Sequence, residues 1–191
     1  MADEPGYLNI HQEYIEKCRK GDRKAQFEIY KLYFKSLYNT SLRIVRDPQE
    51  AEDIMQESFL SAFIKINTYS GKVSFGAWLK KIVINNSLDA LKKRRLLTEE
   101  LNDDFSEKVA NEEETETDIS EIKIENIIEA VHGLPDGYRV VLSLKLFEGY
   151  DHDEIAEILG ISSSSSRSQF TRAKQKLLRI LEKKKSTNGK S

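Results

Sequence analysis

Apolar side chains recur at steps of three and four residues along most of the chain, which is the spacing of helices that bury one face. This spacing predicts helices over residues 8–20, 22–46, 48–67 and 74–95, and the pattern resumes at residue 124. Gly21, Asp47-Pro48 and Ser70-Gly71 separate the first four segments, because glycine and proline interrupt helices. Runs that alternate as in a β-strand are hard to find, so we expect an all-α fold.

The segment from residue 98 to 121 has no apolar periodicity and is strongly acidic. Lys108 is its one basic residue, whereas residues 92–95 and 167–185 on either side are rich in lysine and arginine. Such a composition is typical of a chain that connects domains without folding itself. We therefore expect two small helical domains, over residues 8–97 and 122–183, joined by a flexible acidic linker over residues 98–121.

The segment after Gly149 has the pattern of a helix-turn-helix. Asp151 and Glu154 have the spacing of a capping box, and Gly160 permits the positive φ of the turn. The second helix turns polar side chains outward that can bond base edges or phosphates: Ser163, Ser165, Arg167, Ser168, Gln169, Thr171, Arg172 and Lys174. Ser166 stands where a buried aliphatic residue is usual. A helical hairpin with a polar outer face shares this pattern, and DNA binding is the interpretation that we favour.

Composition and charge limit the other classes of protein. Hydrophobic residues make up 39% of the chain and charged residues 32%, which favours small helical domains with large surfaces. No apolar run approaches the roughly 20 residues of a membrane span and no signal peptide is visible, so we expect a cytoplasmic protein without membrane insertion. Cys18 is the single cysteine, and we expect a thiol on a helix face and not a redox sensor.

Two series of residues together resemble the extracytoplasmic-function (ECF) sigma factors of bacterial RNA polymerase, a group of the sigma-70 family. Residues 53–60, residues 68–79, Asn85 and residues 92–95 resemble sigma region 2. Residues 134–181, including Gly160-Ile161-Ser162 and Arg172-Ala173-Lys174, resemble sigma region 4. The resemblance implies a transcription initiation factor that binds core RNA polymerase, directs it to promoters through −10 and −35 elements and assists promoter opening.

The resemblance also implies roles for particular residues. Docking on core polymerase would use Asp53, Gln56, Glu57, Phe59 and Leu60. Reading and melting of the −10 element would use Tyr69, Ser70, Gly71, Lys72, Lys80, Lys81, Asn85, Lys92, Arg94 and Arg95. Within this set Tyr69 would stack on a flipped base of the non-template strand. For Trp78 we expect packing within the domain.

In the second domain the resemblance implies that the second helix of the helix-turn-helix recognises the −35 element. Its main contacts would be Arg167, Ser168, Gln169 and Arg172. Gln169 replaces a basic residue that is common at that position, which changes the expected sequence preference. The resemblance further implies an anti-sigma factor as a partner. It also implies a linker that threads toward the RNA exit path of the polymerase.

Two alternatives belong to other classes. An operator-binding helix-turn-helix regulator would act without core polymerase, and it would leave Tyr69 and residues 53–60 without a role. An enzyme has thin support, because Glu129 and His132 form one Glu-x-x-His motif and a di-iron bundle needs two. Helix capping explains Asp151 and Asp153 better than catalysis does. We expect no catalytic residues, no metal site and no cofactor.

Overall fold

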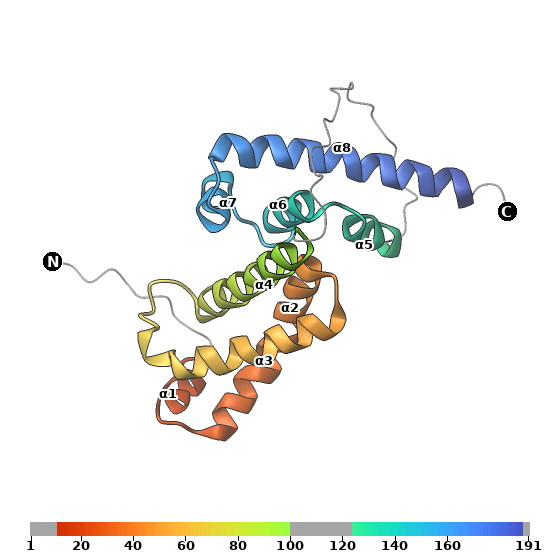
Figure 1. The fold of residues 1–191 in the computed structure, drawn as a ribbon. Helices are drawn as coiled ribbons and strands as arrows, with labels where there is room; N and C mark the ends of the chain where they lie inside the picture. Colours follow the sequence, from red (N-terminus) through yellow and green to blue (C-terminus); the bar gives the residue numbers. More distant parts are fainter. Residues whose placement is uncertain (1–10, 100–123, 189–191) are drawn as a thin grey trace. The chain divides into compact units, whose positions relative to one another are not determined.

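The computed structural model describes residues 11–99 and 124–188, and helices make up most of both ranges. In chain order the elements are α1 (Gln12–Arg19), α2 (Arg23–Val45), α3 (Pro48–Ile64), the 3-10 turn η1 (Ile66–Thr68), α4 (Phe75–Glu99), α5 (Ile124–His132), α6 (Asp136–Leu146), α7 (His152–Leu159) and α8 (Ser163–Asn188), as Figure 1 shows. No strand occurs in the described residues. The predicted all-α fold is confirmed.

The chain divides into two compact units, Met1–Arg95 and Leu96–Ser191. Helix α4 continues to Glu99, two residues into the predicted linker, because neither glycine nor proline stops it earlier. The rest of that linker, residues 100–121, lies outside the described residues. The same holds for residues 8–10 of the first predicted helix and for the last three residues of the chain.

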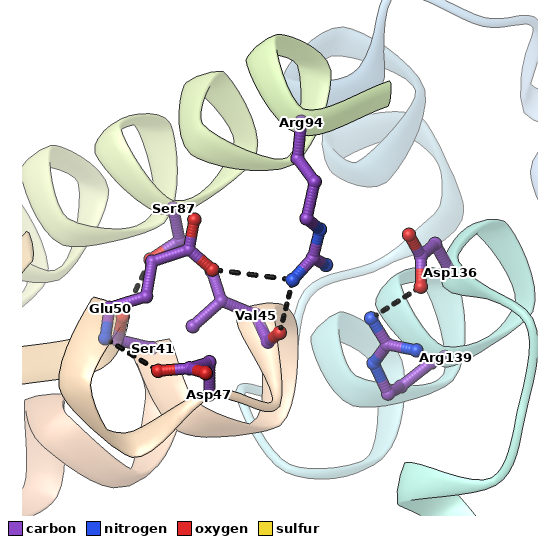
Figure 2. Close-up of polar contacts among 8 residues, drawn as sticks. All are labelled: Ser41, Val45, Asp47, Glu50, Ser87, Arg94, Asp136 and Arg139. Carbon is purple, nitrogen blue, oxygen red and sulfur yellow. Dashed lines mark hydrogen bonds and ion pairs between the residues drawn. The ribbon is translucent and has the colours of Figure 1, made fainter. Parts of the chain in front are cut away.

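Aspartate side chains cap the N-terminal ends of α2 and α3 in the first unit. The carboxylate of Asp22 accepts hydrogen bonds from the backbone N–H groups of Lys24 and Ala25 at 2.8 and 3.1 Å, which caps α2. Asp47 caps α3 in the same way by accepting from the N–H of Glu50 at 2.8 Å (Figure 2). Both caps fall where the sequence predicted helix boundaries.

The core of the first unit is rich in aromatic and aliphatic side chains from α1 to α4. Its fully buried members include Ile15, Ile29, Met55, Phe75 and Leu79. Cys18 is also buried, and burial raises the pKa of its thiol to about 11, with the charge of Asp22 adding to the shift. This thiol therefore stays protonated at neutral pH and is a packing residue.

Hydrogen bonds between buried polar side chains join α4 to the helices beneath it. The hydroxyls of Ser41 and Ser87 are hydrogen-bonded at 3.0 Å across α2 and α4 (Figure 2). The amide of Asn86 donates to the hydroxyl of Ser58 on α3 at 2.9 Å. Because buried polar groups are costly when unpaired, these bonds fix the rotation of α4 about its axis. Asn85, the residue before Asn86, is consequently exposed.

The second unit is organised around α8, which packs against α5, α6 and α7. Val131, Leu134, Leu142 and Ala173 form its buried centre. Arg139 of α6 is fully buried as well, and it donates to the backbone carbonyl of Leu134 at 2.9 Å. It also donates to the carboxylate of Asp136 at 2.8 Å, as Figure 2 shows. Burial of a guanidinium is tolerated only when it is paired, so Arg139 fastens the α5–α6 turn.

Candidate nucleic-acid and protein interfaces

The predicted docking residues lie on α3, and all but one of them face solvent. Asp53, Gln56, Glu57 and Leu60 are exposed. Phe59 is 3% exposed, and its ring centre lies 4.9 Å from that of Tyr30 in the core. The buried stripe of α3 passes through residue 59, which explains this placement. Phe59 is therefore a core residue beneath the exposed docking residues and does not itself face a partner.

The sequence reasoning did not single out Ile64, which is the most exposed large apolar side chain among the described residues, at 73%. It follows Leu60, itself 63% exposed, by four residues on α3. Residues four apart lie on the same helix face, so Ile64 extends the row that runs from Asp53 through Glu57 and Leu60. That four-residue step was visible in the sequence. We call Asp53, Gln56, Glu57, Leu60 and Ile64 the α3 surface.

The loop between η1 and α4 is closed around Tyr69. The Tyr69 ring is 4% exposed, its hydroxyl donates to the backbone carbonyl of Val73 at 2.7 Å, and its centre lies 5.3 Å from Phe75 and 5.5 Å from Trp78. The structure thus does not present this ring as an open platform for a base. Trp78 packs against its neighbours, as expected.

The outer rim of this loop is polar and open. Ser70, Lys72 and Val73 are exposed, and Gly71 has a φ of +76°, a conformation that L side chains rarely adopt. The rim therefore offers a hydroxyl, an ammonium group and accessible backbone beside the buried Tyr69. These are groups that can bond a nucleic-acid strand.

The predicted DNA-contacting residues of α4 differ in accessibility. Lys81, Asn85 and Lys92 are exposed and Lys80 is half-buried. Lys92 lies 3.7 Å from the carboxylate of Asp89, but both are well exposed, so this ion pair holds the lysine weakly. The side chain of Arg95 lies outside the described residues.

Arg94 is tied to its own domain. Its Nη1 donates to the backbone carbonyl of Val45 at 3.2 Å and lies 3.4 Å from the carboxylate of Glu50 (Figure 2). Val45 is the last residue of α2, where a cation also interacts favourably with the helix dipole. Arg94 therefore joins α4 to the α2–α3 turn.

The capping predictions for the helix-turn-helix are confirmed. The carboxylate of Asp151 accepts from the N–H groups of Asp153 and Glu154, both at 2.8 Å, and the Glu154 carboxylate accepts from the N–H of Asp151 at 2.7 Å. Gly160 ends α7 with a φ of +66°. The hydroxyl of Ser162 accepts from the N–H of Ser165 at 3.1 Å and so caps α8.

The outward face of α8 carries the predicted base and phosphate contacts. Arg167, Ser168, Thr171, Arg172 and Lys174 are exposed. The other predicted contacts, Ser163, Ser165 and Gln169, are half-buried. The exposed set places two guanidinium groups and two hydroxyls on one helix, which is the chemistry of base and phosphate recognition in a major groove.

Ser166 is fully buried, and its partner explains why a hydroxyl stands in the core. Its oxygen lies 2.9 Å from Nδ1 of His152 on α7. The imidazole also meets the ring of Phe170 edge-on at 5.6 Å. Desolvation and the charges of Lys145 and Arg167 lower the pKa of His152 from its ordinary value, against the raising effect of Asp151 and Asp153.

Comparison with known proteins gives the same division of the chain. Residues 29–96 match the family model of sigma-70 region 2, and residues 124–177 match that of sigma-70 region 4. The ECF RNA polymerase sigma factor SigW of Bacillus subtilis is 29% identical over 177 residues, which cover 87% of this chain and 94% of that protein. The ECF RNA polymerase sigma-E factor of Haemophilus influenzae is 26% identical over 173 residues, with 86% and 91% covered.

Solved structures share the fold. The sigma factor RpoE of Bartonella quintana, in complex with the anti-sigma factor NepR, has a TM-score of 0.58 at 21% identity and covers 81% of this chain and 95% of its own. CnrH in complex with the cytosolic domain of CnrY has a TM-score of 0.56 at 20% identity, with 90% and 97% covered.

Two helical domains that match sigma regions 2 and 4 in the same order define a transcription initiation factor, which directs RNA polymerase to promoters. The chain belongs to the ECF group of the sigma-70 family. Within the described ranges, no helix combines the length and the apolar character that crossing a membrane requires.

Proposed function

We propose that this sigma factor docks on core RNA polymerase through the α3 surface, recognises the −10 element with α4 and the loop before it, and recognises the −35 element with α8. The observation that carries the proposal is the helix-turn-helix, in which both helices are capped and α8 presents Arg167 and Arg172 to solvent. Capping and core packing fix the direction of that face, so its contacts are organised before DNA arrives.

The α3 surface suits a protein partner with a basic, partly apolar groove. Asp53 and Glu57 give it negative charge at one end, and Leu60 and Ile64 give it accessible apolar area at the other. Charge complementarity would steer the encounter, and burial of the apolar end would supply affinity. We assign this partner as core polymerase, since the family match covers the helix.

The exposed face of α8 suits duplex DNA. Arg167 and Arg172 can neutralise phosphates or bond guanine edges, and Ser168 and Thr171 can bond either bases or backbone. The half-buried Gln169 replaces a cation in the family pattern, so affinity should depend less on phosphate charge there. We propose this helix as the reader of the −35 element.

The −10 element is assigned to the exposed Lys81 and Asn85 of α4 and to the rim of the loop at Ser70 and Lys72. Stacking of Tyr69 on a flipped base is retained as a proposal, and it requires the ring to leave the contacts with Phe75 and Trp78. The hydrogen bond from its hydroxyl to the backbone carbonyl of Val73 would break in that movement. The Tyr69 ring would then exchange its contacts with Phe75 and Trp78 for stacking on the base.

Further properties follow from the same proposal. An anti-sigma factor is a fitting partner, since the similar RpoE structure is a complex with the anti-sigma factor NepR. The protein would act without covalent chemistry, in the cytoplasm where promoters are transcribed. The carboxylate of Glu129, from the Glu-x-x-His motif, is paired with Lys184 and so joins α5 to α8.

Transcription of fragmented genomic DNA by core polymerase, with and without the protein, tests the proposal. The expected result is a set of new RNA 5′ ends that share two upstream sequence motifs. The variant Arg172→Ala should lose most of these starts. Lys35→Ala, which removes an exposed charge from α2, should keep them. Duplex binding by the free protein, with no new starts and no affinity for core, would support an operator-binding regulator.

A further inference from the structure

Arg19, at the end of α1, reaches the loop that closes around Tyr69. Its Nη2 donates to the backbone carbonyl of Tyr69 at 2.8 Å, across 50 positions of the sequence. Its Nη1 donates to the carboxylate of Glu16 one turn earlier at 2.9 Å. The Arg19 side chain is 30% exposed, so the bond to the carbonyl is partly shielded from water.

The two ends of Tyr69 are held by different partners. Arg19 bonds the backbone oxygen, whereas Val73 bonds the phenolic hydroxyl. Movement of the ring about its side-chain torsions would break the bond to Val73 and leave the backbone bond to Arg19 intact. The hydrogen bond at the Tyr69 carbonyl can therefore persist while the hydrogen bond at the Tyr69 hydroxyl is broken.

Helix α1 is a rigid base for this contact. Ile15 and Cys18 bury it in the core at 0% and 3% exposure, and α1 packs against η1, the turn that leads into the loop. The ion pair between Glu16 and Arg19 is half exposed, so it adds little stability by itself. Its effect is to orient the guanidinium toward the carbonyl.

We propose that Arg19 is a positioning residue for promoter opening, which holds the backbone at Tyr69 in place while the ring and the loop rim rearrange to take up an unpaired base. This inference rests on the proposed role of the loop at residues 69–74. Without Arg19 the backbone and the ring would move together, and the rearrangement that takes up the first unpaired base would be slower. A charge-assisted bond to a carbonyl is strong enough to act in this way.

The experiment compares opening of a duplex promoter with binding of the same promoter carrying a pre-opened bubble, using holoenzyme made with full-length variants. Arg19→Ala should slow opening of the duplex by about tenfold, the scale of one charge-assisted hydrogen bond. Arg19→Lys retains the charge and one donor and should recover part of the rate. Binding to the bubble template, affinity for core and the melting temperature should stay close to the parent protein.

Lys17→Ala is the matched control. Lys17 lies on the same helix and forms an exposed ion pair with Glu13, one turn earlier. Removal of the Lys17 side chain should therefore leave promoter opening unchanged. Equal opening rates for Arg19→Ala and Lys17→Ala would overturn the proposal. An equal loss by Arg19→Ala on duplex and bubble templates would also overturn it, because general destabilisation acts on both.

The variant Tyr69→Leu separates this inference from the role of the loop. It keeps a buried apolar side chain but removes the ring. If Tyr69→Leu impairs opening and Arg19→Ala does not, the loop acts in opening and Arg19 has no part in positioning it. If both variants open promoters normally, the proposed role of the loop fails together with this inference.

Discussion

The hydroxyl of Ser166 on α8 lies 2.9 Å from Nδ1 of His152 on α7, and this bond joins the two helices of the helix-turn-helix inside its core. A serine at a buried aliphatic position looks like a packing defect until its partner is known. We predict that Ser166→Ala lowers the free energy of unfolding by about 1 kcal/mol, since it removes one hydrogen bond and leaves the imidazole nitrogen unpaired. Chemical denaturation of the full chain measures this, with Ser168→Ala, which changes an exposed serine of the same helix, as the control.

The lowered pKa of His152 predicts that the helix-turn-helix loses stability on mild acidification. The unfolded chain takes up the proton near pH 6.5, the ordinary value, while the folded chain resists it because of desolvation and the charges of Lys145 and Arg167. Stability is therefore complete above pH 6.5 and falls as the pH drops through the interval down to the folded pKa. Melting temperatures at pH 7.5 and 5.5 should differ less for His152→Gln than for the parent chain. An identical difference would remove His152 as the cause.

Arg172 should contribute one phosphate contact to binding at the −35 element. Arg172→Ala is expected to reduce the slope of log affinity against log salt by about one, the value for one neutralised phosphate. Binding to duplex fragments at several salt concentrations measures the slope, with Lys35→Ala as the control that should not change it. A slope equal to that of the parent protein would exclude Arg172 as a phosphate ligand.

Charge reversal on the α3 surface should weaken assembly with core polymerase. Glu57→Lys is expected to lower the affinity at least tenfold, because it places a cation where an acidic group should meet a basic surface. The same substitution at the exposed Glu13 of α1, which lies outside the α3 surface, is the matched control. Titration of labelled core with each variant gives the affinities. Equal affinities of the two variants for core polymerase would exclude Glu57 from the docking surface.

The ring of Tyr69 should matter for opening and not for promoter binding. Tyr69→Leu is expected to leave core affinity and duplex binding unchanged while it reduces permanganate reactivity of the thymines around the start site. The loss should be at least several-fold, in line with the roughly 1–3 kcal/mol that stacking of one base on an aromatic ring provides. Normal reactivity would sink the stacking role.

Local signals in the sequence predicted the helices and their caps well. The capping box at Asp151 and Glu154 and the left-handed turn at Gly160 depend on residues a few positions apart, and they occur as predicted. Contacts between distant residues were beyond this reasoning. His152 and Ser166 stand 14 positions apart, and neither residue type signals such a partner.

In the candidate site, too, the packing of side chains from different elements could not be predicted from the sequence. The resemblance to sigma region 2 led to the expectation that the Tyr69 ring stacks on a base, which requires an accessible ring. Its burial depends on Phe75 and Trp78 from the following helix, which fold back over the loop. Phe59 lies on the buried stripe of α3, so its periodicity alone favoured the core. The burial of Arg139 was not predicted because arginine is rarely fully buried, although its partner Asp136 stands only three residues earlier in the sequence.

The burial of Cys18 has a practical consequence. It is the sole cysteine of the chain, and its thiol, with a pKa of about 11, offers almost no thiolate to a maleimide dye at neutral pH. The native chain should therefore react very little with a maleimide dye, so an introduced cysteine can be labelled specifically. A cysteine introduced at exposed Ser70 or Ser168 would carry a single fluorophore, so motions of the loop and of the recognition helix could be followed separately in single molecules of holoenzyme.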